Sequence, residues 1–349
     1  MRWQYLFDPL FVIPILSLGS VSLAVIGSSN SGLFLNQLIF FAIGILFFII
    51  FARIDYRIYR HLRGLFYILS ALLLLLVLFG PNVRGATRWL DIFGLRIQAS
   101  EIIKPFFFIF LVDFLNERPP ISLKNLLFAT VLFLPILFLV FKQPDLGNAV
   151  VFLGVFLFLL LAGGIRPLYT VLGIFLFLGL LPFIWFHLLD YQKIRILSFI
   201  NPYSDPKGAG YNALQAIIAI GGGGLWGLGL GRGTQSHLLF LPEFHTDFAF
   251  AALVEEFGFL GGIVVLLFYA VLLARIIQII LKTSDPFGRL IGVAIFAQIL
   301  LQVFINIGMN LGILPITGIT LPLLSYGGSS IVSLFISLGI LMSVRNRET

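Results

Sequence analysis

The chain has 349 residues, of which 60% are hydrophobic and 11% are charged, and its mean hydropathy is +1.09. A soluble domain carries about 45–50% apolar and about 25% charged residues, so this composition excludes a soluble globular enzyme and a disordered chain. The net charge of +7 includes no basic block with interleaved aromatic residues, and cysteine is absent, which argues against a nucleic-acid partner, disulfides and cysteine-based zinc sites.

The apolar residues gather in segments of the length that a membrane-spanning helix needs, about 20 residues. The span 98–115 is the weakest because it contains Glu101 and Lys104, and the span 247–281 is long enough to tilt or protrude. The chain is therefore predicted to be an all-α integral membrane protein that forms a single polytopic domain over residues 1–349. Ten spans are predicted, at about 10–26, 33–52, 64–80, 98–115, 125–141, 147–163, 167–187, 247–281, 286–310 and 322–343.

Lysine and arginine set the expected orientation of these spans. Most of the 22 basic residues fall on the cytoplasmic side if the N-terminus lies inside, so both termini are expected in the cytoplasm. The segment of about 188–246, between the seventh and eighth spans, then forms a long extracytoplasmic loop. Its apolar run 211–220 predicts an interfacial or re-entrant helix, and the glycines at 221–224 predict either close approach of a lipid headgroup or a flexible tether. Proline and glycine at 306–330 predict broken or re-entrant backbone.

Titratable groups gather on the outer side, where the long loop meets the next span. Glu243, His245 and Asp247 lie close together in the sequence there. Asp247 precedes an apolar helix, so partial desolvation is expected to raise its pKa and make it a stronger base. An N-terminal cap formed by Thr246 or Asp247 is the other interpretation, and a cap does not exclude a base. His245 is a competing base because its ordinary pKa lies near neutrality.

Further charged residues lie within or between the predicted spans. Glu255 and Glu256 are two turns into the eighth span, where a charge is costly unless it is functional or pairs with an Arg or Lys. Glu101 and Lys104 are three residues apart and are expected to pair on one helix face. Asp145 is expected to be either functional or the cap of a tight turn between two spans.

Six motifs along nearly the whole chain resemble those of the SEDS family (shape, elongation, division and sporulation), which are polytopic peptidoglycan glycosyltransferases. The run 201–206 and Gly233-Thr234-Gln235-Ser236 resemble the elongation members more than the division members. The six motifs are Gly85-Ala86-x-Arg88-Trp89, Ser100-Glu101-x-x-Lys104, Gln143-Pro144-Asp145-Leu146-Gly147, Leu241-Pro242-Glu243-x-His245-Thr246-Asp247-Phe248, Glu255-Glu256-x-Gly258 and Leu321-Pro322-x-x-Ser325-Tyr326-Gly327-Gly328-Ser329.

This resemblance implies polymerisation of lipid II, a disaccharide-pentapeptide linked to a lipid pyrophosphate, into β-1,4 glycan strands during cell elongation. The donor is α-linked, so the transfer is inverting and needs a base on the acceptor hydroxyl, and the resemblance selects Asp247 as that catalytic base. Trp89 is either part of the site or an interfacial belt residue. The implied substrate-binding residues are Arg88, Trp89, Glu101, Lys104, Asp145, Arg195, Glu243, His245, Glu255, Glu256 and Ser325.

The resemblance also implies partners and a location. Arg88, Lys104 or Arg195, or a divalent cation such as Mg²⁺ or Mn²⁺, would bind the pyrophosphate, and no metal ligands are assigned. Expected partners are lipid II, a class B penicillin-binding protein that acts as a transpeptidase, other elongation-complex proteins and membrane lipids. The expected location is the bacterial cytoplasmic (inner) membrane, with the active site facing the extracytoplasmic side.

Two other functions stay open from the sequence. A flippase for lipid-linked precursors would need a polar path through both leaflets, whereas Asp113 is the main charge in the inner half of any predicted span. A non-catalytic scaffold that activates a cell-wall synthase would use its polar residues only at the interface, and it would tolerate Asp247→Asn.

Overall fold

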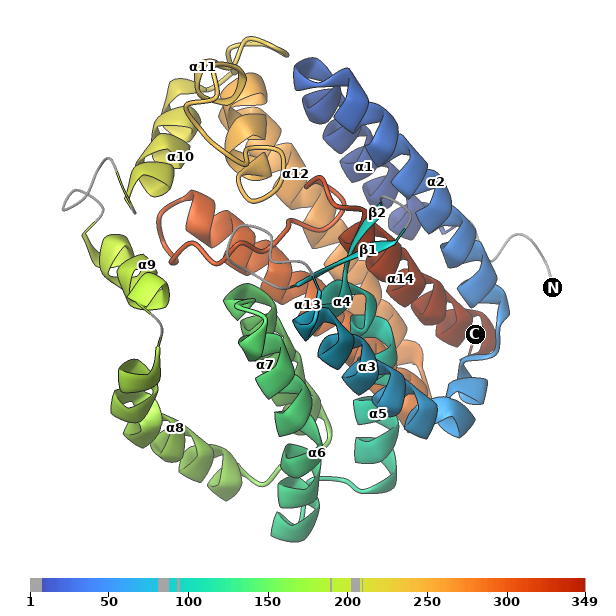
Figure 1. Ribbon diagram of the computed structural model, residues 1–349. Helices are drawn as coiled ribbons and strands as arrows, with labels where there is room; N and C mark the ends of the chain where they lie inside the picture. Colours follow the sequence, from blue (N-terminus) through green and yellow to red (C-terminus); the bar gives the residue numbers. More distant parts are fainter. Residues whose placement is uncertain are drawn as a thin grey trace.

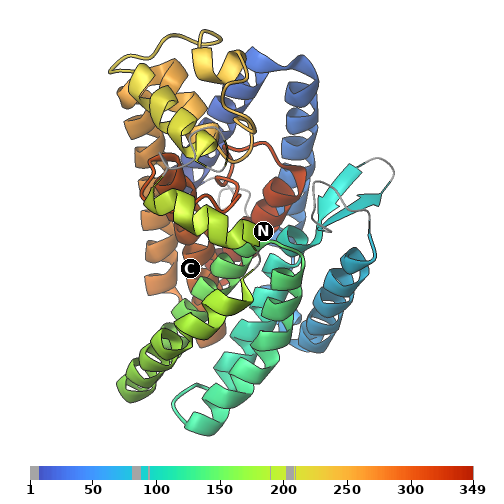
Figure 2. The ribbon, with the colours of Figure 1, turned by 60° about the vertical axis from the view of Figure 1, so that its left-hand side comes forward.

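The computed structural model describes residues 8–80, 88–92, 95–188, 190–201, 208 and 210–348. Within these ranges the fold is a bundle of long helices with one two-stranded antiparallel hairpin (Figures 1 and 2). The elements are α1 (Pro9–Ser29), α2 (Ser31–Arg53), the 3-10 helix η2 (Tyr56–Leu62), α3 (Arg63–Leu78), β1 (Trp89–Ile92), β2 (Leu95–Gln98), α4 (Ala99–Ile102), α5 (Lys104–Glu117), α6 (Leu123–Lys142), α7 (Leu146–Ala162), α8 (Pro167–His187), α9 (Asp190–Ile200), α10 (Tyr211–Gly222), α11 (Thr234–His237), α12 (Ala249–Lys282), α13 (Pro286–Asn310) and α14 (Gly328–Glu348).

Seven helices of the described chain are long and apolar enough to cross a membrane. They are α1, α2, the stretch Tyr56–Leu78 that includes α3, α6, α12, α13 and α14. Two shorter apolar helices, α7 and the Pro167–Phe183 part of α8, add to this set. The predicted all-α membrane class is confirmed, and the count of ten spans stays a prediction.

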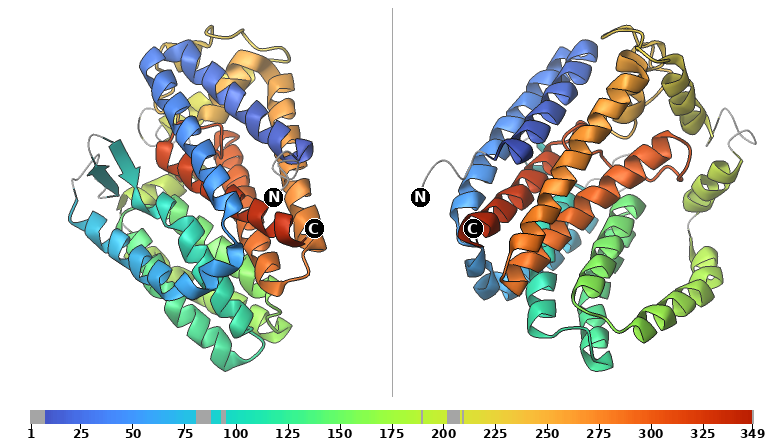
Figure 3. Two further views of the ribbon diagram at one scale, coloured as in Figure 1. Left: turned by 90° about the vertical axis from the view of Figure 1, so that its right-hand side faces the viewer. Right: turned by 180° about the vertical axis from the view of Figure 1, so that it is seen from behind.

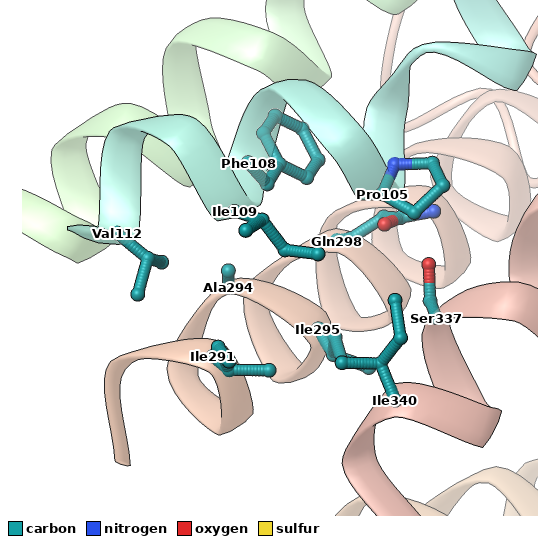
Figure 4. Close-up of a pocket in the computed structure, with 10 residues that line it drawn as sticks. All are labelled: Pro105, Phe108, Ile109, Val112, Ile291, Ala294, Ile295, Gln298, Ser337 and Ile340. Atoms are coloured by element: carbon teal, nitrogen blue, oxygen red, sulfur yellow. The ribbon is translucent and has the colours of Figure 1, made fainter. Parts of the chain in front are cut away.

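The core of the bundle lies where α5, α13 and α14 meet. The span windows of α13 and α14 are each 72% buried, the highest value among the seven long helices. Apolar side chains such as Ile109, Ile291 and Ile340 come together at this junction (Figure 4), and the space left between them is about 10 Å³. Small residues let neighbouring helices approach, as at Gly44 of α2, where an added Cβ would lie 2.4 Å from the Phe335 ring of α14.

Two helices extend away from this bundle. α8 and α9 lie to one side of the other helices (Figures 1 and 3), and the described side chains of α8 are almost all exposed. Most of the exposed residues of α8 are apolar, so lipid rather than water suits its surroundings.

The long helix α12 is broken near its N-terminal end. It has 34 residues, and Gly258 within it has a φ of 71° and a ψ of −173°, which are not helical. Backbone groups beside the break pair with the segment 224–229, as when the Leu228 amide donates to the Glu255 carbonyl at 2.9 Å. The length in excess of one span therefore forms a separate N-terminal segment, 249–257, which follows the turn that carries Asp247.

Two predicted spans have different bounds in the structure. The span predicted at 98–115 is divided at Ile103 into α4 and α5, since Pro105 has no amide to donate and suits the start of a new helix. The span predicted from residue 322 begins at Gly328, because Leu323 adopts a φ of 67° and residues 311–327 form turns and extended backbone. The broken backbone predicted for this region is confirmed.

The predicted outer loop of about 188–246 contains three helices, α9, α10 and α11. α10 covers the apolar run that predicted an interfacial or re-entrant helix, and its depth in a bilayer stays a prediction. Gly223, which ends α10, packs against α12, because an added Cβ would lie 2.1 Å from the Val254 carbonyl oxygen. Close packing against α12 therefore requires a glycine at position 223, which is a different reason from the two that the sequence suggested.

Candidate active site

A polar cavity of about 540 Å³ lies where the β1–β2 hairpin, the residues before α12 and the segment between α13 and α14 meet. Five of the predicted site residues line it: Arg88, Trp89, Glu243, His245 and Asp247. Asn36 and Phe40 of α2 contribute to another wall. The cavity is therefore built from four parts of the chain that are far apart in the sequence.

Asp247 lies in the turn that leads into α12, and its half-buried side chain lines the cavity. The amides of Thr246, Asp247 and Phe248 all donate to the carbonyl of Glu243, which has a φ of 55°. α12 begins at Ala249, and no side chain from the turn before it caps the helix. The prediction that Thr246 or Asp247 caps this helix is therefore wrong, and the Asp247 side chain lines the cavity instead.

A glycine stands directly against the Asp247 carboxylate. Gly318 has a φ of 74°, which disfavours other residues, and an added Cβ would lie 3.4 Å from Asp247 Oδ2. The backbone of the segment between α13 and α14 thus forms the wall beside the carboxylate.

Two arginines of the hairpin region give the cavity positive charge. Arg88 immediately precedes β1. Arg96 lies on β2, opposite Asp91 of β1 in the antiparallel strand register. Among the described residues no acceptor hydrogen-bonds Arg88 Nε, which is buried. Both arginines line the same cavity as Asp247, so the cavity can bind an anionic group close to a carboxylate.

Asp145 supports the hairpin from outside the cavity lining. Its Oδ2 accepts from Gln98 Nε2 and Ser100 Oγ, both at 2.7 Å, and from Asn148 Nδ2 at 2.9 Å. It also accepts the Asn148 amide, so the predicted cap at the start of α7 is confirmed. Since Gln98 does line the cavity, Asp145 holds one of the lining residues in place.

Glu101 and Lys104 form the predicted i,i+3 pair. Lys104 Nζ lies 2.6 Å from Glu101 Oε1, and both side chains are buried. Neither residue is part of the cavity lining. Ser333 Oγ of α14 donates to the backbone carbonyl of Glu101, which ties the short helix α4 to α14.

Glu255 and Glu256 hold the residues around α11 onto α12. Glu255 accepts from the amides of Gln235 and Ser236, at 2.7 and 3.1 Å, and from two hydroxyls nearby. Glu256 Oε1 lies 2.8 Å from His237 Nε2 and also accepts from Ser28 Oγ. Within the described chain the expected Arg or Lys partner is not found, because backbone amides, hydroxyls and a histidine take that place.

Two predicted site residues remain, Ser325 and Arg195, and the structure describes the side chain of Ser325 alone. Ser325 Oγ donates to the Thr246 carbonyl at 2.5 Å and accepts the Leu321 amide at 2.8 Å, so it ties the segment after α13 to the turn that carries Asp247. Arg195 belongs to α9, and its side chain lies outside the described part of the structure, as do residues 85 and 86 of the first motif and 202–207 of the outer loop.

Several residues of the site were not predicted from the sequence. Arg96 and Gln98 alternate with Leu95 and Ile97, and this period of two is the signal that would have predicted a strand with a polar face. Asn306 and Asn310 are buried and contact the Asp247 backbone from α13, which no local pattern reveals.

The fold and the cavity together define a polytopic helical membrane protein with a charged site between its helices. Residues 3–349 match the model of the FtsW, RodA and SpoVE family, described as cell cycle proteins. The chain belongs to this family.

Relatives of known name match nearly all of the chain. Peptidoglycan glycosyltransferase MrdB of Escherichia coli (strain K12) is 40% identical, over 98% of this chain and 94% of the relative. Stage V sporulation protein E of Bacillus subtilis (strain 168) is 39% identical, over 88% of this chain and 86% of the relative.

Solved structures agree with the sequence relatives. A chain from a study of polymerization and crosslinking by a peptidoglycan synthase complex has a TM-score of 0.86 at 29% identity, and 98% of each chain is covered. The rod shape determining protein RodA of Thermus thermophilus has a TM-score of 0.74 at 27% identity, with 98% of this chain and 97% of that chain covered.

Proposed function

We propose that this protein polymerises lipid II by inverting glycosyl transfer, with Asp247 as the general base. It is a peptidoglycan glycosyltransferase, the activity for which its relative at 40% identity is named. The observation that carries the mechanism is the placement of the Asp247 carboxylate in a cavity that is also lined by Glu243 and by two arginines. This transfer needs a carboxylate that accepts the hydroxyl proton and cationic groups that bind the leaving pyrophosphate.

The bond changes follow from the chemistry of the donor. The oxygen of the acceptor 4-hydroxyl forms a bond to the anomeric carbon of the donor sugar as the bond from that carbon to the pyrophosphate oxygen breaks. The hydroxyl proton passes to the Asp247 carboxylate, and the electron pair leaves with the lipid pyrophosphate. Because attack and departure take place on opposite faces, the α-linked donor gives a β-linked glycan.

Arg88 and Arg96 are the proposed pyrophosphate ligands. A guanidinium offers paired N–H donors that match phosphate oxygens, and both side chains line the cavity. Lys104, considered from the sequence for the same task, is fully buried against Glu101 and does not line the cavity. The proposal therefore transfers this role from Lys104 to Arg96.

A divalent cation would have few protein ligands here. Among the described residues there is no group of three or more acidic or histidine side chains arranged to hold a metal ion. Mg²⁺ often takes only one or two carboxylates together with substrate phosphates, and Glu243 in the cavity wall would supply one of these. Such an ion would offset the charge of the pyrophosphate.

The proposed setting is the bacterial cytoplasmic membrane, with the cavity on the extracytoplasmic side and both termini in the cytoplasm. A class B penicillin-binding protein is the proposed partner, which agrees with a structural neighbour taken from a peptidoglycan synthase complex. A flippase is less well supported, because the inner charge Asp113 pairs with Arg60 and Arg63, at 3.5 and 3.0 Å, and lines no described cavity.

The test uses purified protein in detergent with lipid II and Mg²⁺, with and without the class B partner. Glycan chains on a gel, together with released lipid pyrophosphate, are the expected products. A complex that binds lipid II but forms neither product would contradict the proposed activity and favour the scaffold or the flippase.

A further inference from the structure

Two buried asparagines of α13 lie directly behind Asp247. Asn306 and Asn310 are both 0% exposed. Their amide nitrogens donate to the backbone carbonyl oxygen of Asp247, at 3.0 Å from Asn306 Nδ2 and 3.1 Å from Asn310 Nδ2. The backbone of the proposed base is thus held by two side chains of another helix.

Asn306 also joins Asp247 to the neighbouring segment between α13 and α14. Its Nδ2 donates to the Ile319 carbonyl oxygen at 2.6 Å. Ile319 follows Gly318, whose backbone stands against the Asp247 carboxylate. One amide group therefore fixes both the residue that carries the carboxylate and the segment that the carboxylate faces.

Asn310 makes a second kind of contact. Its Oδ1 accepts the Ala251 amide at 3.1 Å, and this amide belongs to the first turn of α12, where helical amides lack partners within the helix. Asn310 thus caps α12 from α13, while its Nδ2 donates to the Asp247 carbonyl. An amide side chain both donates and accepts, whereas an ionised carboxylate only accepts, so aspartate cannot replace it.

We infer that Asn306 and Asn310 are positioning residues that set where the Asp247 carboxylate stands in the cavity. The inference rests on the proposed function of Asp247 as base. A catalytic group needs its supporting hydrogen bonds to hold it within about 0.5 Å of the productive position, and a displacement of about 1 Å can lower the rate about 10²-fold.

The test compares variants of the full chain with its class B partner, using initial rates of lipid II polymerisation across substrate concentration and pH. Asn310→Asp keeps the acceptor for the Ala251 amide and loses the donor to Asp247, so kcat is expected to fall about 10–10²-fold with KM near the wild-type value. Asn310→Ser, which is shorter than asparagine, is expected to give the same loss, and it replaces Asn310→Asp if that variant does not fold.

The pH profile separates positioning from general stability. Asn306→Asp places a second carboxylate behind Asp247, which is expected to raise the pKa of Asp247 and move the acidic limb of the rate profile to higher pH. Gln302→Leu is the matched control, since Gln302 is also buried on α13 and hydrogen-bonds neither Asp247 nor Ile319 in the described structure. This control is expected to keep the wild-type profile.

Two results would overturn the inference, and they differ from each other. If folded asparagine variants keep the wild-type kcat and pH profile while Asp247→Asn is inactive, the base role stands and the positioning role is wrong. If Asp247→Asn is itself active, the proposed function of Asp247 fails, and the inference fails with it.

Discussion

At the scale of single residues, two carboxylates, Glu243 and Asp247, and two arginines line one cavity of about 540 Å³. Asp247 stands just before a helix, and its side chain lines the cavity. Arg88 and Arg96 approach from the hairpin, which Asp145 holds through Gln98. The proposed chemistry thus depends on a few polar residues that a larger buried network holds in place.

Removing either arginine is expected to weaken the interaction with the leaving pyrophosphate. A hydrogen bond to a charged group contributes about 1.5–3 kcal/mol, so Arg88→Gln and Arg96→Gln should each lower the polymerisation rate about 10–10²-fold. Arg166→Gln, an exposed arginine between α7 and α8, is the control and should leave the rate unchanged. The rates are measured as glycan yield at short times. Wild-type rates in all three variants would argue against a pyrophosphate site at the hairpin.

At the scale of elements, α12 is broken at Gly258, and the segment before the break carries Glu255 and Glu256, which bond the residues around α11. Gly258 and Gly227 lie back to back, because a Cβ on Gly258 would lie 2.3 Å from the Gly227 amide nitrogen. This contact between backbones leaves no side chain that could give way. The glycine is therefore required by geometry at this position.

Gly258→Ala is expected to destabilise the protein by at least about 1–3 kcal/mol, from the strain of a positive φ in a residue with a side chain. Gly221→Ala is the matched control, since nothing lies within 4 Å of an added Cβ there and alanine favours the helix α10. Thermal unfolding in detergent should show a lower Tm for Gly258→Ala only. An unchanged Tm for this variant would contradict the described break.

The elements also show what the sequence could and could not predict. The Glu101–Lys104 pair and the Asp145 cap were predictable, because each joins residues within one turn of one another. The partners of Glu255 and Glu256 were not, since they lie on a segment that folds back over α12. The hairpin was also missed, because two four-residue strands give a weak period beside spans of about 20 apolar residues.

At the scale of the whole molecule, hydropathy predicted the class of the fold, since lipid requires every spanning segment to satisfy its own backbone. It could not predict which helices touch, or that the site is assembled from α2, the hairpin, the turn before α12 and the segment after α13. Those contacts depend on side chains such as Asn306, which bonds a residue that is 59 positions away.

The orientation of the molecule is open to a direct labelling test. The chain contains no cysteine, so single cysteines can be introduced without background. Leu238→Cys, at an exposed position after α11, should react with a membrane-impermeant maleimide on intact spheroplasts, whereas Lys124→Cys should react only after lysis. The opposite labelling pattern would place the cavity on the cytoplasmic side and contradict the proposed setting.

The measurement that tests the central claim most directly is lipid II polymerisation by Asp247→Asn beside wild type, with lipid II binding measured on the same samples. An asparagine amide cannot take the acceptor proton, so the variant is expected to bind lipid II and form no glycan chains. Glu117→Gln, which alters an exposed carboxylate elsewhere, should polymerise like wild type. Glycan chains formed by folded Asp247→Asn at the wild-type rate would contradict the assignment of Asp247 as the base.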